Sequence, residues 1–149
     1  MKMTTKQYKA MMAKKGRDVT VPASKKPAIM FKGYIMRSKW EAQYAYHLET
    51  LRSNGKILVW DYEPERFILG ANCSYLPDFR VVTNDWELVY IEVKGYARAA
   101  GMVKWKTAAA NNLHAMFLMV RMRGQSPVLM NIAPHREMSV TPEMFGAPE

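Results

Sequence analysis

The chain has 149 residues, 49% of them hydrophobic, which suits one folded domain with a single core. No apolar run approaches the roughly 20 residues that a membrane-spanning helix needs, and residues 1–6 lack the apolar segment of a signal peptide. The one cysteine, Cys73, excludes an internal disulfide. We therefore expect a protein that stays in the cytoplasm and has no membrane partner.

The net charge of +9 is concentrated at one end of the chain. Residues 1–39 contain eleven basic residues and one acidic residue, whereas the remainder has eleven basic and twelve acidic residues. This asymmetry favours contact with a phosphate backbone, and a solvated tail is a compatible alternative. We predict a basic N-terminal arm over residues 1–33. The phosphate contacts expected from this basic region are Lys14, Lys15, Arg17, Lys25, Lys26 and Arg37.

The first predicted elements are short, and a longer helix follows them. Residues 4–15 have the pattern of an amphipathic helix, and residues 29–36 are either an edge strand or a lead into the next helix. Ser38 is a typical N-cap with Glu41 three residues later, and Gly55 ends the helix. The apolar stripe expected to pack on a sheet is Trp40, Tyr44, Leu48 and Leu51.

Strands dominate the middle of the chain. We predict strands over residues 56–62 and 66–69, a loop over residues 71–74, and then a hairpin of residues 79–83 and 88–94. A helix over residues 97–112 precedes an almost wholly apolar run at 114–120, which is typical of a strand buried on both faces. The helix would connect two parallel strands. Four prolines after Gly124 predict an irregular tail over residues 124–149.

Two short motifs on the predicted hairpin carry the candidate chemistry. Asp78 follows Pro77 at the start of one strand, and Glu92 and Lys94 alternate with apolar residues on the next. Carboxylates bind hard cations, and an ammonium beside them can orient a water or neutralise a phosphate. A Glu-x-Lys tripeptide alone is expected about 0.5 times by chance in such a chain. The order of the surrounding elements therefore carries the specificity.

That order resembles the PD-(D/E)xK nuclease superfamily, and more closely a family of small phage proteins related to phage endonuclease I, a Holliday-junction resolvase. The nuclease domain of TnsA-type proteins has much the same pattern. The resemblance covers roughly residues 34–122, and it implies an α/β restriction-endonuclease-like core over residues 34–123, with a central mixed β-sheet flanked by helices. The segments that carry it are Arg37-Ser38-Lys39-Trp40-Glu41, Trp60-Asp61-Tyr62-Glu63-Pro64, Tyr75-Leu76-Pro77-Asp78-Phe79 and Glu92-Val93-Lys94-Gly95.

The resemblance also implies roles for individual residues. Asp78, Glu92 and the Val93 carbonyl would bind Mg²⁺ or Mn²⁺, and Lys94 would position the attacking water. Glu41 would complete the metal site, although from the residues alone it reads equally as a helix-capping carboxylate. A further catalytic candidate is Glu63. The helix after Gly95 often touches substrate in this family, which implies phosphate contacts at Arg98, Lys104 and Lys106, with a solvated helix face as the alternative.

We therefore expect a metal-dependent DNA endonuclease that hydrolyses phosphodiester bonds, with branched or Holliday-junction DNA as the leading substrate. A general phage nuclease or nickase is one alternative, and a non-catalytic DNA-binding recombination accessory protein is another. The resemblance raises a homodimer as one arrangement, which the thirteen methionines allow. A phage-encoded protein of this kind would act in the host-cell cytoplasm.

Overall fold

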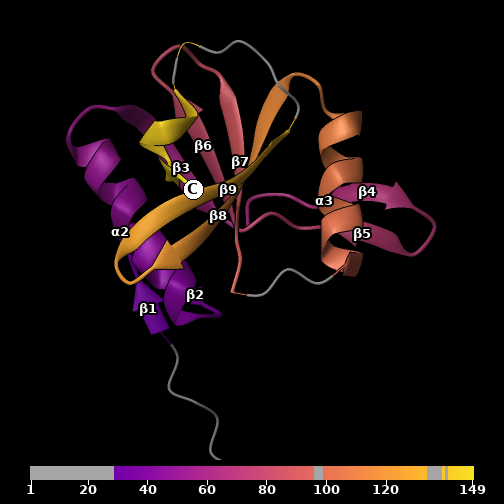
Figure 1. Cartoon of the computed structure of the whole chain (residues 1–149), viewed down its shortest axis with the longest axis horizontal. Helices are drawn as coiled ribbons and strands as arrows, with labels where there is room; N and C mark the ends of the chain where they lie inside the picture. Colours follow the sequence, from indigo (N-terminus) through magenta and orange to yellow (C-terminus); the bar gives the residue numbers. More distant parts are fainter. Residues whose placement is uncertain (1–28, 96–98, 134–138, 140) are drawn as a thin grey trace, which may run out of the picture.

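A six-stranded mixed sheet with strand order β10-β9-β8-β7-β6-β3 forms the centre of the fold (Figure 1). The computed structural model describes residues 29–95, 99–133, 139 and 141–149. Within them two helices, α2 (Lys39–Ser53) and α3 (Ala99–Asn111), flank the sheet, which confirms the predicted α/β class. The strands are β3 (Ile57–Tyr62), β6 (Phe79–Thr83), β7 (Leu88–Val93), β8 (Ala115–Arg123), β9 (Ser126–Ala133) and β10 (Ala147–Pro148).

The two helices cover opposite faces of the sheet. On one face Leu48 of α2 packs in the same core as Ile91 of β7, and on the other face Trp105 of α3 packs with Tyr90. The neighbouring residues Tyr90 and Ile91 thus face different cores, as the alternation along a strand predicts. Neither helix of the described residues is long and apolar enough to cross a bilayer.

The predicted start of α2 is confirmed. The Ser38 hydroxyl accepts a hydrogen bond from the Glu41 amide at 3.1 Å, which satisfies one free donor of the first turn. The Glu41 carboxylate accepts from the Arg37 amide at 3.2 Å, one residue earlier than in a standard capping box. The placement of Trp40 in the apolar stripe is wrong, because its side chain is 41% exposed beside a pocket. The first turn of α2 therefore extends beyond the core.

The predicted hairpin and crossover are also confirmed. Strands β6 and β7 pair antiparallel with Phe79 opposite Ile91. Strand β8 then pairs parallel to β7, with Glu92 beside Met119, and α3 forms the connection. Six consecutive residues of β8 are buried, as expected for a strand covered on both faces.

Two small hairpins lie outside the main sheet. Strands β1 (Ile29–Phe31) and β2 (Tyr34–Met36) pair with each other, which replaces the predicted edge strand or helix lead. Strands β4 (Phe67–Gly70) and β5 (Cys73–Tyr75) form the second hairpin, so the predicted loop over residues 71–74 is shorter than expected. Asn72 adopts a positive φ of 55° at its turn, a conformation that asparagine tolerates.

The prediction of an irregular tail after Gly124 is wrong. Strand β9 pairs antiparallel with β8 and parallel with β10, and a 3₁₀ turn, η1 (Pro142–Met144), lies between β9 and β10 in the sequence. Phe145 is fully buried, and its carbonyl accepts from the Tyr44 hydroxyl at 2.8 Å. Pro127 lies near the start of β9, Pro142 begins the 3₁₀ turn, and Pro148 lies in the edge strand β10. At strand ends, first turns and edges a missing N–H is tolerated.

The close packing of the C-terminal segment gives a stability test. A Cβ on Gly146 would lie 2.9 Å from the Leu129 amide nitrogen, so Gly146→Ala should destabilise the fold by about 1–3 kcal/mol. Urea unfolding measures the change. The control is Gly70→Ala, because a Cβ at Gly70 meets no atom within 4 Å. Equal stability of the two variants would contradict the packing of this segment on β9.

Candidate active site

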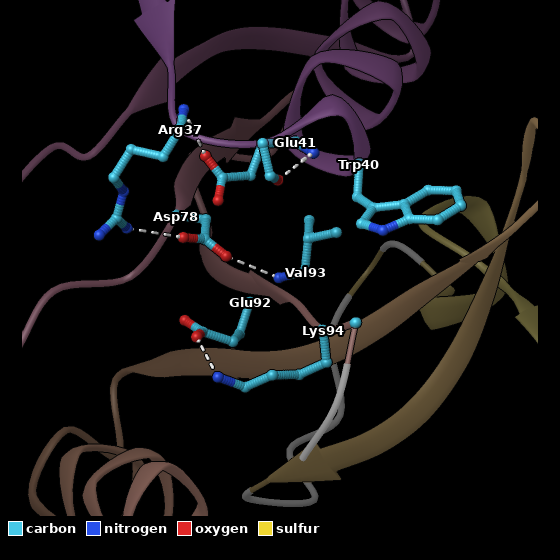
Figure 2. Close-up of a pocket in the computed structure, with 9 residues that line it drawn as sticks. Arg37, Trp40, Glu41, Asp78, Glu92, Val93 and Lys94 are labelled. Atoms are coloured by element: carbon cyan, nitrogen blue, oxygen red, sulfur yellow. Dashed lines mark hydrogen bonds and ion pairs between the residues drawn. The ribbon is translucent and has the colours of Figure 1, made fainter. Parts of the chain in front are cut away.

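A pocket of about 450 Å³ lies where the start of α2 meets the ends of β6 and β7 (Figure 2). Asp78 directly precedes β6, Glu92 lies near the end of β7, Lys94 follows that strand, and Glu41 is in the first turn of α2. All four side chains predicted to be catalytic line this pocket, together with Val93. Residues separated by up to 53 positions in the sequence are thus brought to one place.

Asp78 is held between two strand ends. One carboxylate oxygen accepts from the Val93 amide at 2.8 Å, and the other accepts from the Arg37 guanidinium at 3.3 Å. Burial raises the pKa of Asp78 well above its usual range, and repulsion from Glu92 adds to this effect. The Val93 amide and Arg37 act in the opposite direction without cancelling it. The fold therefore holds Asp78 where its negative charge is costly.

Glu92 and Lys94 are joined directly. The Lys94 ammonium donates to one Glu92 oxygen at 2.7 Å, and the Tyr75 hydroxyl donates to the other at 2.8 Å. The Lys94 amide donates to the Val120 carbonyl at 2.8 Å, which extends the pairing of β7 with β8 and fixes the backbone at this lysine. Burial, with the charge of Glu92, raises the pKa of Tyr75, so its hydroxyl remains a donor.

Glu41 combines its position in the helix start with a place in the pocket. Its carboxylate accepts from the Tyr62 hydroxyl at 2.5 Å and from the Arg37 amide. Burial raises the pKa of Tyr62 to about 12, with a further contribution from its hydrogen bond to Glu41. The two interpretations of Glu41, capping and site carboxylate, are therefore compatible in one geometry.

Glu63 is connected to the pocket through Arg37. The Arg37 guanidinium lies 2.6 Å from a Glu63 oxygen and 3.3 Å from an Asp78 oxygen, so one cation pairs with both acids. Glu63 does not line the pocket that contains Asp78. It has a positive φ of 45° immediately before Pro64, a strained position for a residue other than glycine. Arg37, predicted to contact DNA, thus lies inside the candidate site.

The sequence reasoning missed Tyr62 and Tyr75, whose hydroxyls each hold a carboxylate of the site. Tyr62 lies in the motif segment of residues 60–64 and Tyr75 in that of residues 75–79, but only the charged residues of these segments were predicted to be functional. The signal that could have found them is chemical: a tyrosine buried at the end of a strand needs a partner for its hydroxyl, and the nearest acidic motif can provide one.

The donor atoms of the pocket suit a hard cation, but they do not form a ready-made cage. Among the described residues, no group of three or more histidine, cysteine, aspartate or glutamate side chains is arranged to hold a metal ion. Figure 2 shows the carboxyl groups of Glu41, Asp78 and Glu92 in one part of the pocket, with donors from Arg37, Val93 and Lys94 on them. Oxygen donors are the ligands that Mg²⁺ and Mn²⁺ prefer, and a cation would offset the cost of the Asp78 charge.

The predicted DNA contacts differ in their placement. Lys104 and Lys106 are exposed on α3, and Lys104 lines a second pocket whereas Lys106 does not. Arg37 lies in the candidate site. The remaining predicted contacts lie outside the described residues: Lys14, Lys15, Arg17, Lys25, Lys26 and Arg98.

Comparisons of the chain with models of protein families, with curated proteins and with solved structures found no match.

Removing the buried charge of Asp78 should stabilise the protein. The unfolded chain releases this proton near pH 3.8, whereas the folded chain releases it at a higher pH, so ionisation disfavours the folded state increasingly as the pH rises above 3.8. Asp78→Asn should therefore raise the melting temperature at neutral pH by about 2–4 °C and lose this advantage below about pH 4. Asp85→Asn, at an exposed turn position, is the control and should change little. A less stable Asp78→Asn protein at neutral pH would contradict the unfavourable charge.

Proposed function

We propose that this protein is a metal-dependent DNA endonuclease with a restriction-endonuclease-like core. The observation that carries the proposal is the convergence of Glu41, Asp78, Glu92 and Lys94 in one pocket. The motif order resembles the PD-(D/E)xK nucleases, and the meeting of the helix start, the two strand ends and the lysine at one pocket supports the proposal.

The donor set assigns a role to each acidic residue. Asp78 and Glu92 would hold the cation, with Glu41 and the Val93 carbonyl as further ligands. A divalent cation bound there would lower the pKa of a water and offset the charge that develops on the scissile phosphate. For this the oxygens of Asp78 and Glu92 that now accept from Arg37 and Lys94 must become available.

Lys94 and the tyrosines contribute without direct metal contact. The Lys94 ammonium, 2.7 Å from a Glu92 oxygen, is placed to orient the attacking water and to bring positive charge to the phosphate. The Tyr62 hydroxyl donates a hydrogen bond to one oxygen of Glu41, and the Tyr75 hydroxyl donates to one oxygen of Glu92. These bonds fix the orientation of both carboxylates. The site therefore combines carboxylate oxygens that suit a hard cation, the Lys94 ammonium, and two buried tyrosine hydroxyls that orient the carboxylates.

We further propose branched DNA, with a four-way junction as the leading substrate. Support comes from the resemblance to resolvases of the phage endonuclease I type and from the basic segment over residues 1–39. A phosphate-rich surface attracts such a segment independently of base sequence, which suits recognition by shape.

Cleavage by the Lys94→Ala protein tests the proposed chemistry. Labelled four-way junction, linear duplex and single strand are incubated with Mg²⁺, Mn²⁺ or EDTA. The unaltered protein should cut the junction only with a metal, and Lys94→Ala should cut it about 10²–10⁴-fold more slowly while still binding it. The charge-matched control is Lys56→Ala, exposed just before β3 at the far end of that strand from the pocket.

Each cleavage result has a definite meaning. Full-rate cutting by Lys94→Ala would contradict the role of this lysine. Cutting of all three DNAs would indicate a general nuclease rather than a resolvase. Binding of the junction without cutting under any metal would indicate a non-catalytic accessory protein.

Metal binding has a readout that does not depend on cleavage. Mn²⁺ should raise the melting temperature of the unaltered protein, since a ligand at 100 times its Kd stabilises by about 2.7 kcal/mol. The rise should become smaller as the pH is lowered, because the raised pKa of Asp78 makes a proton compete with the cation. Asp78→Asn should lose the rise and Asp85→Asn should keep it. An equal rise in Asp78→Asn would place the metal elsewhere.

A further inference from the structure

A second pocket, of about 270 Å³, adjoins the candidate active site. Arg37, Glu92 and Lys94 line both pockets, so the two pockets adjoin at these side chains. The second pocket adds two cations that the first does not contain, Arg66 and Lys104. They come from different elements: Arg66 directly precedes β4, and Lys104 lies on α3.

The charge in this second pocket is strongly unbalanced. Among the residues that the structure describes, four cationic side chains line it and Glu92 is the only acid. Arg37 and Lys94 already pair with carboxylates of the active site. In the part of the chain that the structure describes, neither Arg66 nor Lys104 has a carboxylate oxygen within 4.0 Å. Their charges are therefore free to meet an anion.

Packing and one hydrogen bond fix the β4–β5 hairpin next to Arg66. One guanidinium nitrogen donates to the Ser74 hydroxyl at 3.1 Å, which ties Arg66 to β5 across the hairpin. Phe67, the next residue, stacks on Tyr75 with ring centroids 6.4 Å apart and packs in the same core as Trp105 of α3. The hairpin and the helix lie side by side in Figure 1. Arg66 is thus held toward the same pocket as Lys104.

Helix α3 also approaches the catalytic lysine closely. A Cβ at Gly101 would lie 3.5 Å from the Lys94 ammonium nitrogen. This is an ordinary van der Waals distance, so α3 lies against the Lys94 ammonium at Gly101, which lines the second pocket. The Lys94 ammonium therefore lies where the two pockets adjoin, between Glu92 and α3.

We propose that the second pocket binds a phosphate next to the scissile phosphate on the same DNA strand, with Arg66 and Lys104 as its ligands. This inference rests on the proposed function, because the first pocket must hold the scissile phosphate. The guanidinium of Arg66 offers paired donors that match two phosphate oxygens, and the Lys104 ammonium adds a point charge. The neighbouring phosphate fixes the strand so that the scissile phosphate lies over Glu92 and Lys94.

The salt dependence of junction binding tests whether these two residues meet a phosphate. Binding is measured in EDTA, where cleavage does not occur, for the unaltered protein and for Arg66→Ala/Lys104→Ala. The slope of log K against log salt should become shallower by about 0.9 for each phosphate contact that is lost. The matched control is Arg52→Ala/Lys56→Ala, which removes one exposed arginine and one exposed lysine that line neither pocket. An unchanged slope in the first variant, or an equal change in the control, would overturn the proposal.

Replacing single phosphates of the DNA by an uncharged analogue locates the phosphate that Arg66 and Lys104 contact. Methylphosphonate is placed at one position at a time along the bound strand, and each junction is titrated in EDTA. At one position the substitution should lower the affinity of the unaltered protein about tenfold. The same substitution should leave the affinity of the Arg66→Ala/Lys104→Ala protein unchanged. If both proteins respond alike at every position, the pocket does not bind phosphate.

The two claims fail separately in these experiments. If the junction is bound but never cut with metal, the proposed function fails, and the phosphate scan still decides the role of the pocket. If the junction is cut but the scan shows no position sensed through Arg66 and Lys104, the nuclease stands and the second phosphate site is rejected.

Discussion

Three largely buried carboxylates share one pocket, and the structure around them is arranged to hold their charge. Asp78 is 4% exposed and Glu92 is 9% exposed, so water contributes little to their solvation. Protein donors replace it: the Val93 amide on Asp78, the Tyr75 hydroxyl on Glu92, and Arg37 and Lys94 as counter-ions. This arrangement needs β6, β7 and the start of α2 in fixed relative positions, which the two cores on either side of the sheet provide.

The counter-ions connect stability to the proposed chemistry. Arg37 and Lys94 lie on the carboxylates and offset part of their repulsion, and the remaining cost of the charge falls mainly on Asp78. On our proposal a divalent cation takes over that role, and the two basic side chains then turn to the phosphates of the DNA. A buried acidic cluster that is expensive to ionise is a frequent feature of functional sites, because the chemistry requires the charge. On the same proposal, Arg66 and Lys104 would extend this positive charge along the DNA strand.

Strong local patterns were predictable from the sequence, whereas positions set by tertiary context were not. The period-two alternation around Glu92, the buried run of β8 and the Ser38 cap each follow from short-range geometry, and all three are present. The four-residue spacing of Trp40 could not show that its turn of α2 extends past the core to the pocket. The four prolines after Gly124 led to the wrong prediction of an irregular segment, because a proline at a strand end or edge does not prevent strand pairing. The carboxylates were found through their motif, and their tyrosine donors depend on contacts between distant segments.

The most direct measurement of the central claim is the position of Mn²⁺ in a crystal of the protein, located by its anomalous scattering. The account predicts a peak within coordination distance of the Asp78 and Glu92 carboxylates, with the Arg37 guanidinium moved off Asp78. Crystals that contain saturating Mn²⁺, show no peak between these two residues and keep Arg37 on Asp78 would contradict it.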